Sequence, residues 1–210
     1  MEVLHIVCEG SSEVNYIVRL RGYLNEVCEG WAQETLLIPV NAGSGNYGVV
    51  ESCIRREKRR QRSGTYMTWV DYDLYAKNVK SCMKQYQERK KDIKAFYFSF
   101  HNFEDFLAMH FDAARYAQYM KSVMASGHCD CPLCGASHEK LFAPIYMDYT
   151  GETYRKGMLS EGFIGKNGLS NLVHNMEHRG IPPVISADSN DFAQWLVDFL
   201  KSRIAELKFP

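Results

Sequence analysis

Short apolar runs alternate with longer amphipathic stretches over the first half of the chain. The apolar runs have the length and the β-branched or aromatic content of buried strands, and they lie at residues 4–8, 35–40, 65–70 and 95–100. The stretches between them carry apolar and charged positions at helical spacing, and they lie at residues 12–27, 49–62 and 77–94. This alternation predicts an α/β fold, with a mostly parallel sheet of about four strands and helices on both faces.

The alternation stops after Asp112, which divides the chain into three parts. Residues 1–112 form the predicted α/β core, and residues 113–150 hold a cluster of cysteines and histidines that predicts a small Cys-rich insertion of the zinc-knuckle kind. Residues 151–210 form a C-terminal extension that we expect to pack on the core. This extension includes a predicted helix from about residue 190 to residue 207.

The composition and charge of the chain exclude several classes of protein. The chain has 210 residues with 25 basic and 25 acidic side chains, and this balance argues against a protein that coats nucleic acid indiscriminately. No apolar run approaches the ~20 residues that a membrane span requires, and the first residues lack the basic and apolar regions of a signal peptide. Most of its seven cysteines are scattered singly, which favours a reducing compartment. We therefore expect a cytoplasmic protein without membrane contact.

Acidic side chains follow the ends of two predicted strands. Glu9 follows the first strand, and Asp71 and Asp73 follow the third, where their spacing points both side chains to the same side of an extended chain. Because the carboxyl ends of parallel strands meet at one edge, these three carboxylates would suit Mg²⁺ or Mn²⁺ there. Such a site can activate water for phosphodiester cleavage. On spacing alone, the alternative is that the three acids cap helix starts at the surface.

Two further residues are candidates for the same chemistry. Glu104 lies in the first turn of a helix that Asn102 is expected to cap, where it could hold a second metal ion or orient water. Its alternative role is a favourable charge at the helix start. Lys156 lies in loop-like sequence and could neutralise a scissile phosphate. His110 falls on the apolar stripe of the Asn102 helix, where a buried core histidine is the more frequent role.

The acidic motifs resemble those of a known family. A strand that ends in Glu9-Gly10, followed by a strand that ends in Asp71-x-Asp73, resembles the TOPRIM domain of topoisomerases, primases and a set of nucleases. The segment from Asn102 to Phe111 is similar to a motif of the RloB-like family, which combines a TOPRIM core with a sequence of roughly Asn-x-Phe-Glu-x-Trp-Leu-x-x-His-Phe. The resemblance covers residues 3–111 and departs from the family at Phe106, where Trp is usual.

This resemblance implies a Mg²⁺-dependent endonuclease that takes part in prokaryotic defence against phage or other mobile DNA. Glu9 would be both a metal ligand and the general base or acid, and Asp71 and Asp73 would be metal ligands. The resemblance also allows for a partner such as an ATPase or another defence protein encoded nearby. DNA or RNA as substrate, and an oligomeric state, both stay open.

A glycine-rich segment offers a competing interpretation. Gly43-x-Gly45-x-x-Gly48 lies between a predicted strand and a predicted helix, as in dinucleotide-binding folds, and Asp71 lies at a suitable distance for ribose recognition. However, the segment follows the second strand rather than the first, and this interpretation gives Glu9 and Asp73 no role. The alternative function is therefore a nucleotide-binding or nucleotidyl-transfer protein. In either case the loop could offer backbone N–H groups to a phosphate.

Basic residues gather in the helix predicted over residues 49–62. Contacts with nucleic-acid phosphates are expected from five of them: Arg55, Arg56, Lys58, Arg59 and Arg60. A solvated helix face is the alternative interpretation of such a run. A third function class follows, a non-catalytic partner in which the acids bind metal only for stability and the basic helices dock on nucleic acid.

The cysteine cluster predicts a structural zinc site. Cys131 and Cys134 have the Cys-x₂-Cys spacing that presents two thiolates to Zn²⁺, and Cys129 and His138 can complete a Cys₃His tetrahedron. Such a site would hold together a segment with a small core. The alternative is a group of reduced or redox-active thiols.

Overall fold

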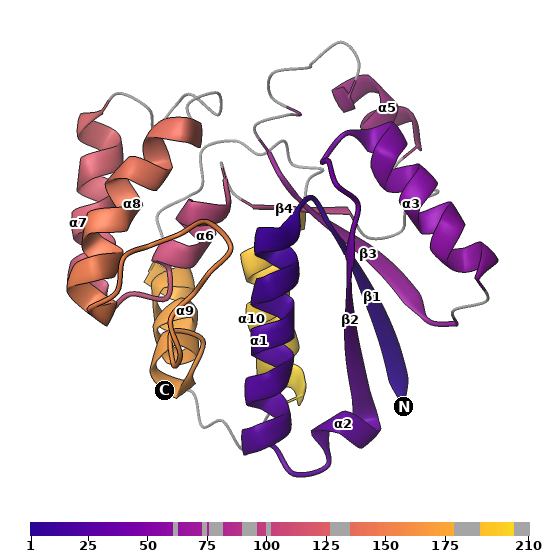
Figure 1. The fold of residues 1–210 in the computed structure, drawn as a ribbon, viewed down its shortest axis with the longest axis horizontal. Helices are drawn as coiled ribbons and strands as arrows, with labels where there is room; N and C mark the ends of the chain where they lie inside the picture. The colour runs from indigo at the N-terminus through magenta and orange to yellow at the C-terminus, as the bar shows by residue number, and fades with distance from the viewer. Residues whose placement is uncertain are drawn as a thin grey trace.

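The computed structural model describes residues 1–60, 63–72, 75, 82–89, 96–99, 102–126, 135–178 and 190–203. Its centre is a parallel sheet with the strand order β2-β1-β3-β4-β5 (Figure 1). The strands are β1 (Glu2–Cys8), β2 (Thr35–Asn41), β3 (Thr65–Asp71), β4 (Phe96–Ser99) and the two-residue β5 (Asn190–Asp191). All pairings between them are parallel, so the predicted α/β class with a parallel sheet is confirmed.

Helices cover both faces of the sheet because neighbouring residues of each strand point to opposite sides. Leu4 and Ile6 of β1 face a core built with α1 (Ser11–Val27) and α10 (Phe192–Arg203). Val7 faces a second core built with α3 (Tyr47–Arg59) and α5 (Cys82–Arg89). Figure 1 shows α3 and α5 to the right of the strands. At the centre of this view, α1 lies in front of α10.

Four helices between β4 and β5 extend the first core. They are α6 (Phe103–Ala108), α7 (Ala113–Ala125), α8 (Gly135–Thr150) and α9 (Lys166–His178). Tyr119 of α7 and Phe142 of α8 are fully buried in the same apolar cluster as the α1 residues. The helices on either side of the cysteine cluster therefore share the main core. A further short helix, α2 (Trp31–Glu34), precedes β2.

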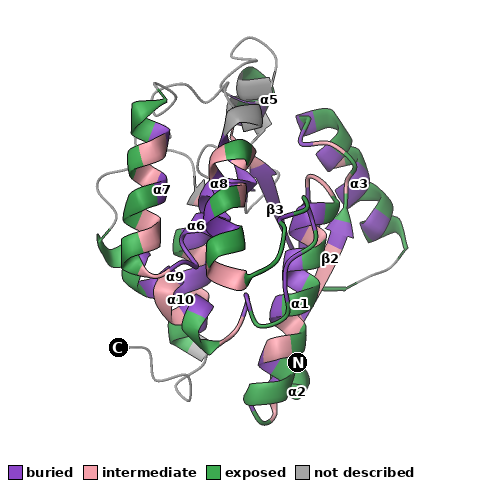
Figure 2. Cartoon of the chain, turned by 60° about the vertical axis from the view of Figure 1, so that its left-hand side comes forward, coloured by how far each residue is buried: buried purple, intermediate pink, exposed green. Residues whose placement is uncertain are grey.

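Each long helix has one buried and one exposed face (Figure 2). On α1 the buried face includes Tyr16, Ile17, Leu20 and Leu24, which is the spacing expected of a helix packed on a sheet.

No helix in the described part of the chain is both long enough and apolar enough to cross a membrane.

The strand order reverses direction at the β1–β3 pair. From β1 the chain moves to β2 on one side, and it then returns across β1 to add β3 and β4 on the other side. In doubly wound sheets the crossover loops diverge at such a point and leave a crevice beyond the carboxyl ends of the two strands, where ligands bind. Glu9 follows β1 directly and Asp71 ends β3, so both lie at this edge of the sheet.

The buried face of α1 should dominate the stability of this arrangement. Leu20 is 0% exposed, so Leu20→Ala leaves a cavity and should lower the free energy of unfolding by about 2–5 kcal/mol. Val18 on the same helix is 42% exposed, and Val18→Ala should change it by less than about 0.5 kcal/mol. Urea unfolding followed by circular dichroism measures both, and equal effects of the two variants would contradict the placement of α1.

Candidate acidic site at the β1–β3 edge

A carboxylate joins the ends of the two central strands. The backbone N–H of Asp71 donates a hydrogen bond of 2.9 Å to Oε2 of Glu9, and the backbone N–H of Glu9 donates one of 3.0 Å to the carbonyl of Trp69. Glu9 and Asp71 are both only half-buried, so solvent reaches this edge. The structure thus brings the Glu9 carboxylate to the backbone of Asp71, and both residues are among the three predicted metal ligands. The third, Asp73, lies outside the described residues.

Glu13 is a buried carboxylate at the same edge, and it is not among the site residues predicted from the sequence. It lies in the first turn of α1, is 4% exposed, and accepts a 3.1 Å hydrogen bond from the backbone N–H of Gly10 through Oε2. Burial, reinforced by the charge of Glu9, raises the pKa of Glu13 to about 7, although backbone hydrogen bonds and Lys156 act in the opposite direction. The signal that could have found it is the spacing of Glu13 four residues after Glu9, at a helix start.

Glu104 and Lys156 complete the cluster from more distant parts of the chain. Glu104 is 2% exposed, and its Oε1 accepts a 3.1 Å hydrogen bond from the hydroxyl of Tyr154. Burial raises the pKa of Glu104, while the charge of Lys156 lowers it. Burial lowers the pKa of Lys156, but the carboxylates of Glu104, Asp71, Glu13 and Glu139 outweigh it, so its pKa is above the ordinary value. We call Glu9, Glu13, Asp71, Glu104 and Lys156 the acidic site.

A tight turn carries Lys156 to the acidic site. Gly157 has a positive φ of 78°, and its carbonyl accepts a 2.8 Å hydrogen bond from the side-chain amide of Asn15 on α1. A Cβ at Gly157 would lie 3.2 Å from the hydroxyl of Ser12, so a side chain there would crowd the start of α1. The turn is therefore fixed against the helix that carries Glu13.

A buried hydrogen-bond network lies behind Glu104. Asn102 caps α6, with its side chain accepting from the backbone N–H of Asp105, as the sequence predicted. The carboxylate of Asp105 in turn accepts a 2.6 Å bond from the hydroxyl of Tyr119 and lies 2.8 Å from Nδ1 of His138. Burial lowers the pKa of His138, but its hydrogen bond to Asp105 and the charges of Asp105 and Glu104 raise it above the ordinary value. This network fixes the first turn of α6 and therefore the position of Glu104.

The glycine-rich segment packs on Glu9 rather than opening a phosphate cradle. A Cβ at Gly45 would lie 2.4 Å from Oε2 of Glu9, so only glycine lets the loop approach that carboxylate. Several N–H groups of the loop are already bonded within the protein, because Gly43 donates to Oδ1 of Asn41 and Gly48 donates to Oδ1 of Asn46. The loop also follows β2, which lies beside the crevice strands and not between them. These contacts disfavour the binding of a dinucleotide by the Gly43–Gly48 loop.

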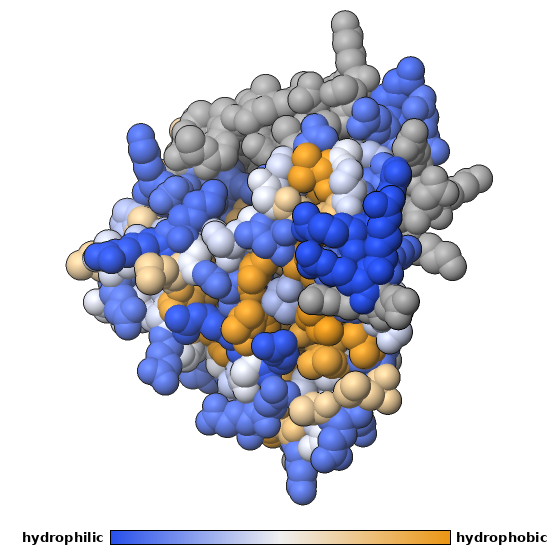
Figure 3. All heavy atoms as spheres, turned by 45° about the vertical axis from the view of Figure 1, so that its right-hand side comes forward, coloured by the Kyte–Doolittle hydropathy of each residue, from blue (hydrophilic) through white to orange (hydrophobic). Residues whose placement is uncertain are grey.

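The predicted phosphate-binding residues lie on the outer side of α3, away from the carboxylates. Four of them, Arg55, Arg56, Arg59 and Arg60, line one open pocket together with Ser52. We call these four the arginine stripe. Lys58 lies apart from them, with its ammonium 5.5 Å from the centre of the Tyr66 ring. Figure 3, in which this side of the molecule comes forward, shows strongly hydrophilic surface gathered in one area.

The predicted zinc ligands are described only in part. Cys129, Cys131 and Cys134 lie outside the described residues, whereas His138 is buried in α8 with its Nδ1 at Asp105. Within the described ranges, no three His, Cys, Asp or Glu side chains are placed so that they could hold a metal ion together. His110 is fully buried, and its Nε2 lies 2.9 Å from the hydroxyl of Tyr16, as expected of a core histidine.

We found no match for the chain among protein-family models, curated proteins or solved structures.

The raised pKa of Glu13 should make the free energy of unfolding depend on pH, and replacing Glu13 with Gln should remove this dependence. The folded pKa of Glu13 is raised from 4.5 to about 7, so the folded state holds a proton that the unfolded chain loses as pH rises through this window. In buffer with EDTA, the contribution of Glu13 to the free energy of unfolding should therefore fall by about 2–3 kcal/mol between these pH values and level off above them.

Urea unfolding between pH 4.5 and pH 8 tests this for the wild type and for Glu13→Gln. The variant should lose this fall, so its stability relative to the wild type should rise with pH. Glu26→Gln, at an exposed position of the same helix, serves as the control and should follow the wild type. Parallel curves for Glu13→Gln and the wild type would show that Glu13 is not buried as described.

Proposed function

We propose that the protein is a divalent-metal-dependent nuclease that hydrolyses phosphodiester bonds of DNA or RNA at the acidic site. The observation that carries this proposal is the hydrogen bond between the Asp71 backbone and the Glu9 carboxylate at the point where the strand order reverses. This bond holds the Glu9 carboxylate at the end of β3, at the edge where doubly wound sheets bind ligands, and the Asp71 carboxylate would be the second ligand there. Carboxylate oxygens are the donors that Mg²⁺ and Mn²⁺ prefer.

The charge of the acidic site fits a bound cation. The carboxylates of Glu104, Asp71, Glu13 and Glu139 all act on Lys156, and the charge of Glu9 acts on Glu13. Like charges near one another favour a cation in their neighbourhood. Glu9 and Asp71 would hold the ion, with Asp73 as the third ligand that the motif predicts. Glu13 and Glu104 would add negative charge near the ion without being its ligands.

Each residue then has a role in hydrolysis. The bound ion would lower the pKa of a coordinated water molecule and stabilise charge on the phosphate. Glu9, beside the water position, would accept or donate the proton. Lys156 keeps its positive charge among the surrounding carboxylates and would bind a non-bridging phosphate oxygen. The network of Asn102, Asp105 and His138 would hold Glu104 in place.

The finer assignment to a TOPRIM-type, RloB-like nuclease in prokaryotic defence is also a proposal. It rests on the Glu9-Gly10, Asp71-x-Asp73 and Asn102–Phe111 motifs, and it is consistent with the parallel sheet and with the buried capping box at Asn102. A partner such as an ATPase or other defence protein belongs to the same proposal.

Nucleotidyl transfer at the same carboxylates is the second candidate activity. The carboxylates that would hold a metal for hydrolysis could serve phosphoryl transfer from a nucleoside triphosphate equally well. The bonded N–H groups of the Gly43–Gly48 loop disfavour nucleotide binding at that loop. Incorporation of nucleotides without cleavage would identify transfer, and metal-independent binding alone would identify a non-catalytic partner.

A structural Zn²⁺ held by Cys129, Cys131, Cys134 and His138 is proposed in addition. His138 fits this role because a histidine whose Nδ1 is bonded to a carboxylate, here Asp105, typically binds zinc through Nε2. The ion would tie the segment between α7 and α8 to the network behind Glu104.

Removal of the central carboxylates should abolish cleavage. Glu9→Gln and Asp71→Asn each remove a ligand charge while keeping the shape of the side chain, and should lower kcat by about 100-fold or more with Mg²⁺ or Mn²⁺. A panel of DNA and RNA substrates, single-stranded and duplex, measures this. Glu152→Gln, at an exposed position, is the control. Cleavage that survives in folded Glu9→Gln and Asp71→Asn would refute the proposed site.

The zinc proposal has a separate test. Protein purified without added metal should contain about one equivalent of zinc by elemental analysis, and Cys131→Ser/Cys134→Ser should contain less than half as much. His178→Gln, an exposed histidine of α9, should leave the content unchanged. A wild-type content under about half an equivalent would count against the site.

A further inference from the structure

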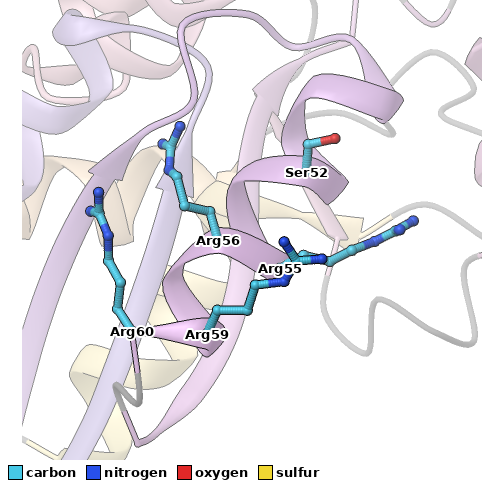
Figure 4. A pocket seen from close by; sticks show the side chains of 5 residues that line it. All are labelled: Ser52, Arg55, Arg56, Arg59 and Arg60. Carbon is cyan, nitrogen blue, oxygen red and sulfur yellow. The ribbon is translucent and has the colours of Figure 1, made fainter.

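The arginine stripe occupies one continuous face of α3. Ser52, Arg55, Arg56, Arg59 and Arg60 follow the i, i+3, i+4, i+7, i+8 spacing of a helix face, and they line a single open pocket. Figure 4 shows Arg56 and Arg60 extending side by side in the same direction, with Arg55 and Arg59 extending to the right of them. The opposite face of α3 is buried against the sheet through Val50, Cys53 and Ile54.

Positive charge exceeds negative charge on this face. Glu51 pairs with Arg55, and the buried Glu57 pairs with Arg60 at 3.1 Å and lies 3.7 Å from Arg56. No ion pair is found for Arg59 among the described residues. The side chains of Arg55, Arg56 and Arg60 remain 57%, 57% and 59% exposed despite their partners. Their guanidinium groups are therefore accessible to an anion from solvent.

The helix that carries the arginine stripe begins close to the acidic site and leads away from it. Gly45, which touches the carboxylate of Glu9, lies two residues before the start of α3 at Tyr47. A helix rises 1.5 Å per residue, so Arg55 and Arg59 lie about 12 Å and about 18 Å along the axis from that start. Figure 1 shows α3 running down one side of the sheet from its upper edge.

We propose that the arginine stripe binds the sugar-phosphate backbone of the substrate on one side of the cut. This inference rests on the nuclease activity proposed above and names its substrate class, a polynucleotide that extends beyond the scissile phosphate. Phosphates advance about 3.4 Å per base pair along a duplex, so a backbone that reaches Arg55 and Arg59 spans roughly four to six base pairs from the carboxylates.

The chemistry of the face favours backbone contact over base recognition. Arginine forms charge-assisted bonds with phosphate oxygens, and contacts of this kind position a nucleic acid without reading its sequence. The residues that line the pocket include no aromatic side chain on which a base could stack. A mononucleotide or dinucleotide bound at the carboxylates is too short to reach the arginines. Substrate length, rather than sequence, is therefore the property that this face selects.

The test combines a double variant with a series of substrate lengths. Arg55→Gln/Arg59→Gln removes two exposed charges from the stripe, and Lys121→Gln/Lys140→Gln removes two exposed charges from α7 and α8 as the matched control. Each protein is assayed on oligonucleotides from about 4 to about 30 base pairs, at several salt concentrations. Circular dichroism checks that both variants fold.

We expect the arginine variant to lower kcat/KM about tenfold or more on long substrates, and to have little effect on the shortest ones. Its slope of log affinity against log salt should be smaller by about 1.8, because each lost phosphate contact contributes about 0.9. The lysine control should match the wild type. An equal loss on all lengths, or no loss on long substrates, would overturn the inference.

Binding separates this inference from the proposed activity. Fluorescence anisotropy with a labelled 30-base-pair duplex, in the presence of Ca²⁺, measures affinity whether or not the duplex is cut. If the arginine variant binds this duplex more weakly but no protein cleaves any substrate, the arginine stripe is supported and the nuclease proposal fails. If the duplex binds both proteins equally while polyglutamate binds only the wild type, the face recognises an acidic protein and the inference is wrong.

Discussion

The candidate site depends on one hydrogen bond, from the backbone of Asp71 to the carboxylate of Glu9. This bond links the ends of β1 and β3, the pair of strands at which the sheet changes direction. In doubly wound sheets the crossover connections diverge at such a pair of strands, so polar groups at the two strand ends can face a shared space. Gly45 is required in the neighbouring loop because any side chain at that position would collide with the Glu9 carboxylate.

Several ionisable groups of the protein are buried where their charged form is disfavoured. Glu13 and Glu104 are almost fully buried, and burial raises the pKa of both. Lys156, from a distant turn, stabilises both of these carboxylates in their charged form. Ionisable groups are buried together at a cost in stability, and strongly perturbed pKa values at the mouth of a crevice are typical of functional sites. The concentration of such groups at one edge of the sheet is therefore the main structural argument for chemistry at this place.

The balanced net charge conceals a separation of charge. Acidic groups gather at the β1–β3 edge, whereas the arginine stripe occupies the outer face of α3. A metal ion at the first location and a phosphate backbone along the second would be complementary, because the ion lets an anionic substrate approach carboxylates that would otherwise repel it. The Gly43–Gly48 loop lies between the two locations and contacts Glu9 at one end and α3 at the other.

The sequence by itself determined the first four strands, their parallel arrangement, the cap at Asn102 and the position of Glu9 and Asp71 at strand ends. These features depend on local signals, namely periodicity, chain direction and capping residues, which are present in short windows of sequence. Only the tertiary structure decided that Glu13 is a buried member of the site, that Asp105 bonds His138, and that Gly45 packs on a carboxylate. It also brought Lys156 to the site through a turn held by Asn15 and Gly157, which are 142 residues apart in the chain. The burial of a residue and the charged groups around it depend on which distant segments of the chain pack together. A local sequence pattern does not show which segments these are.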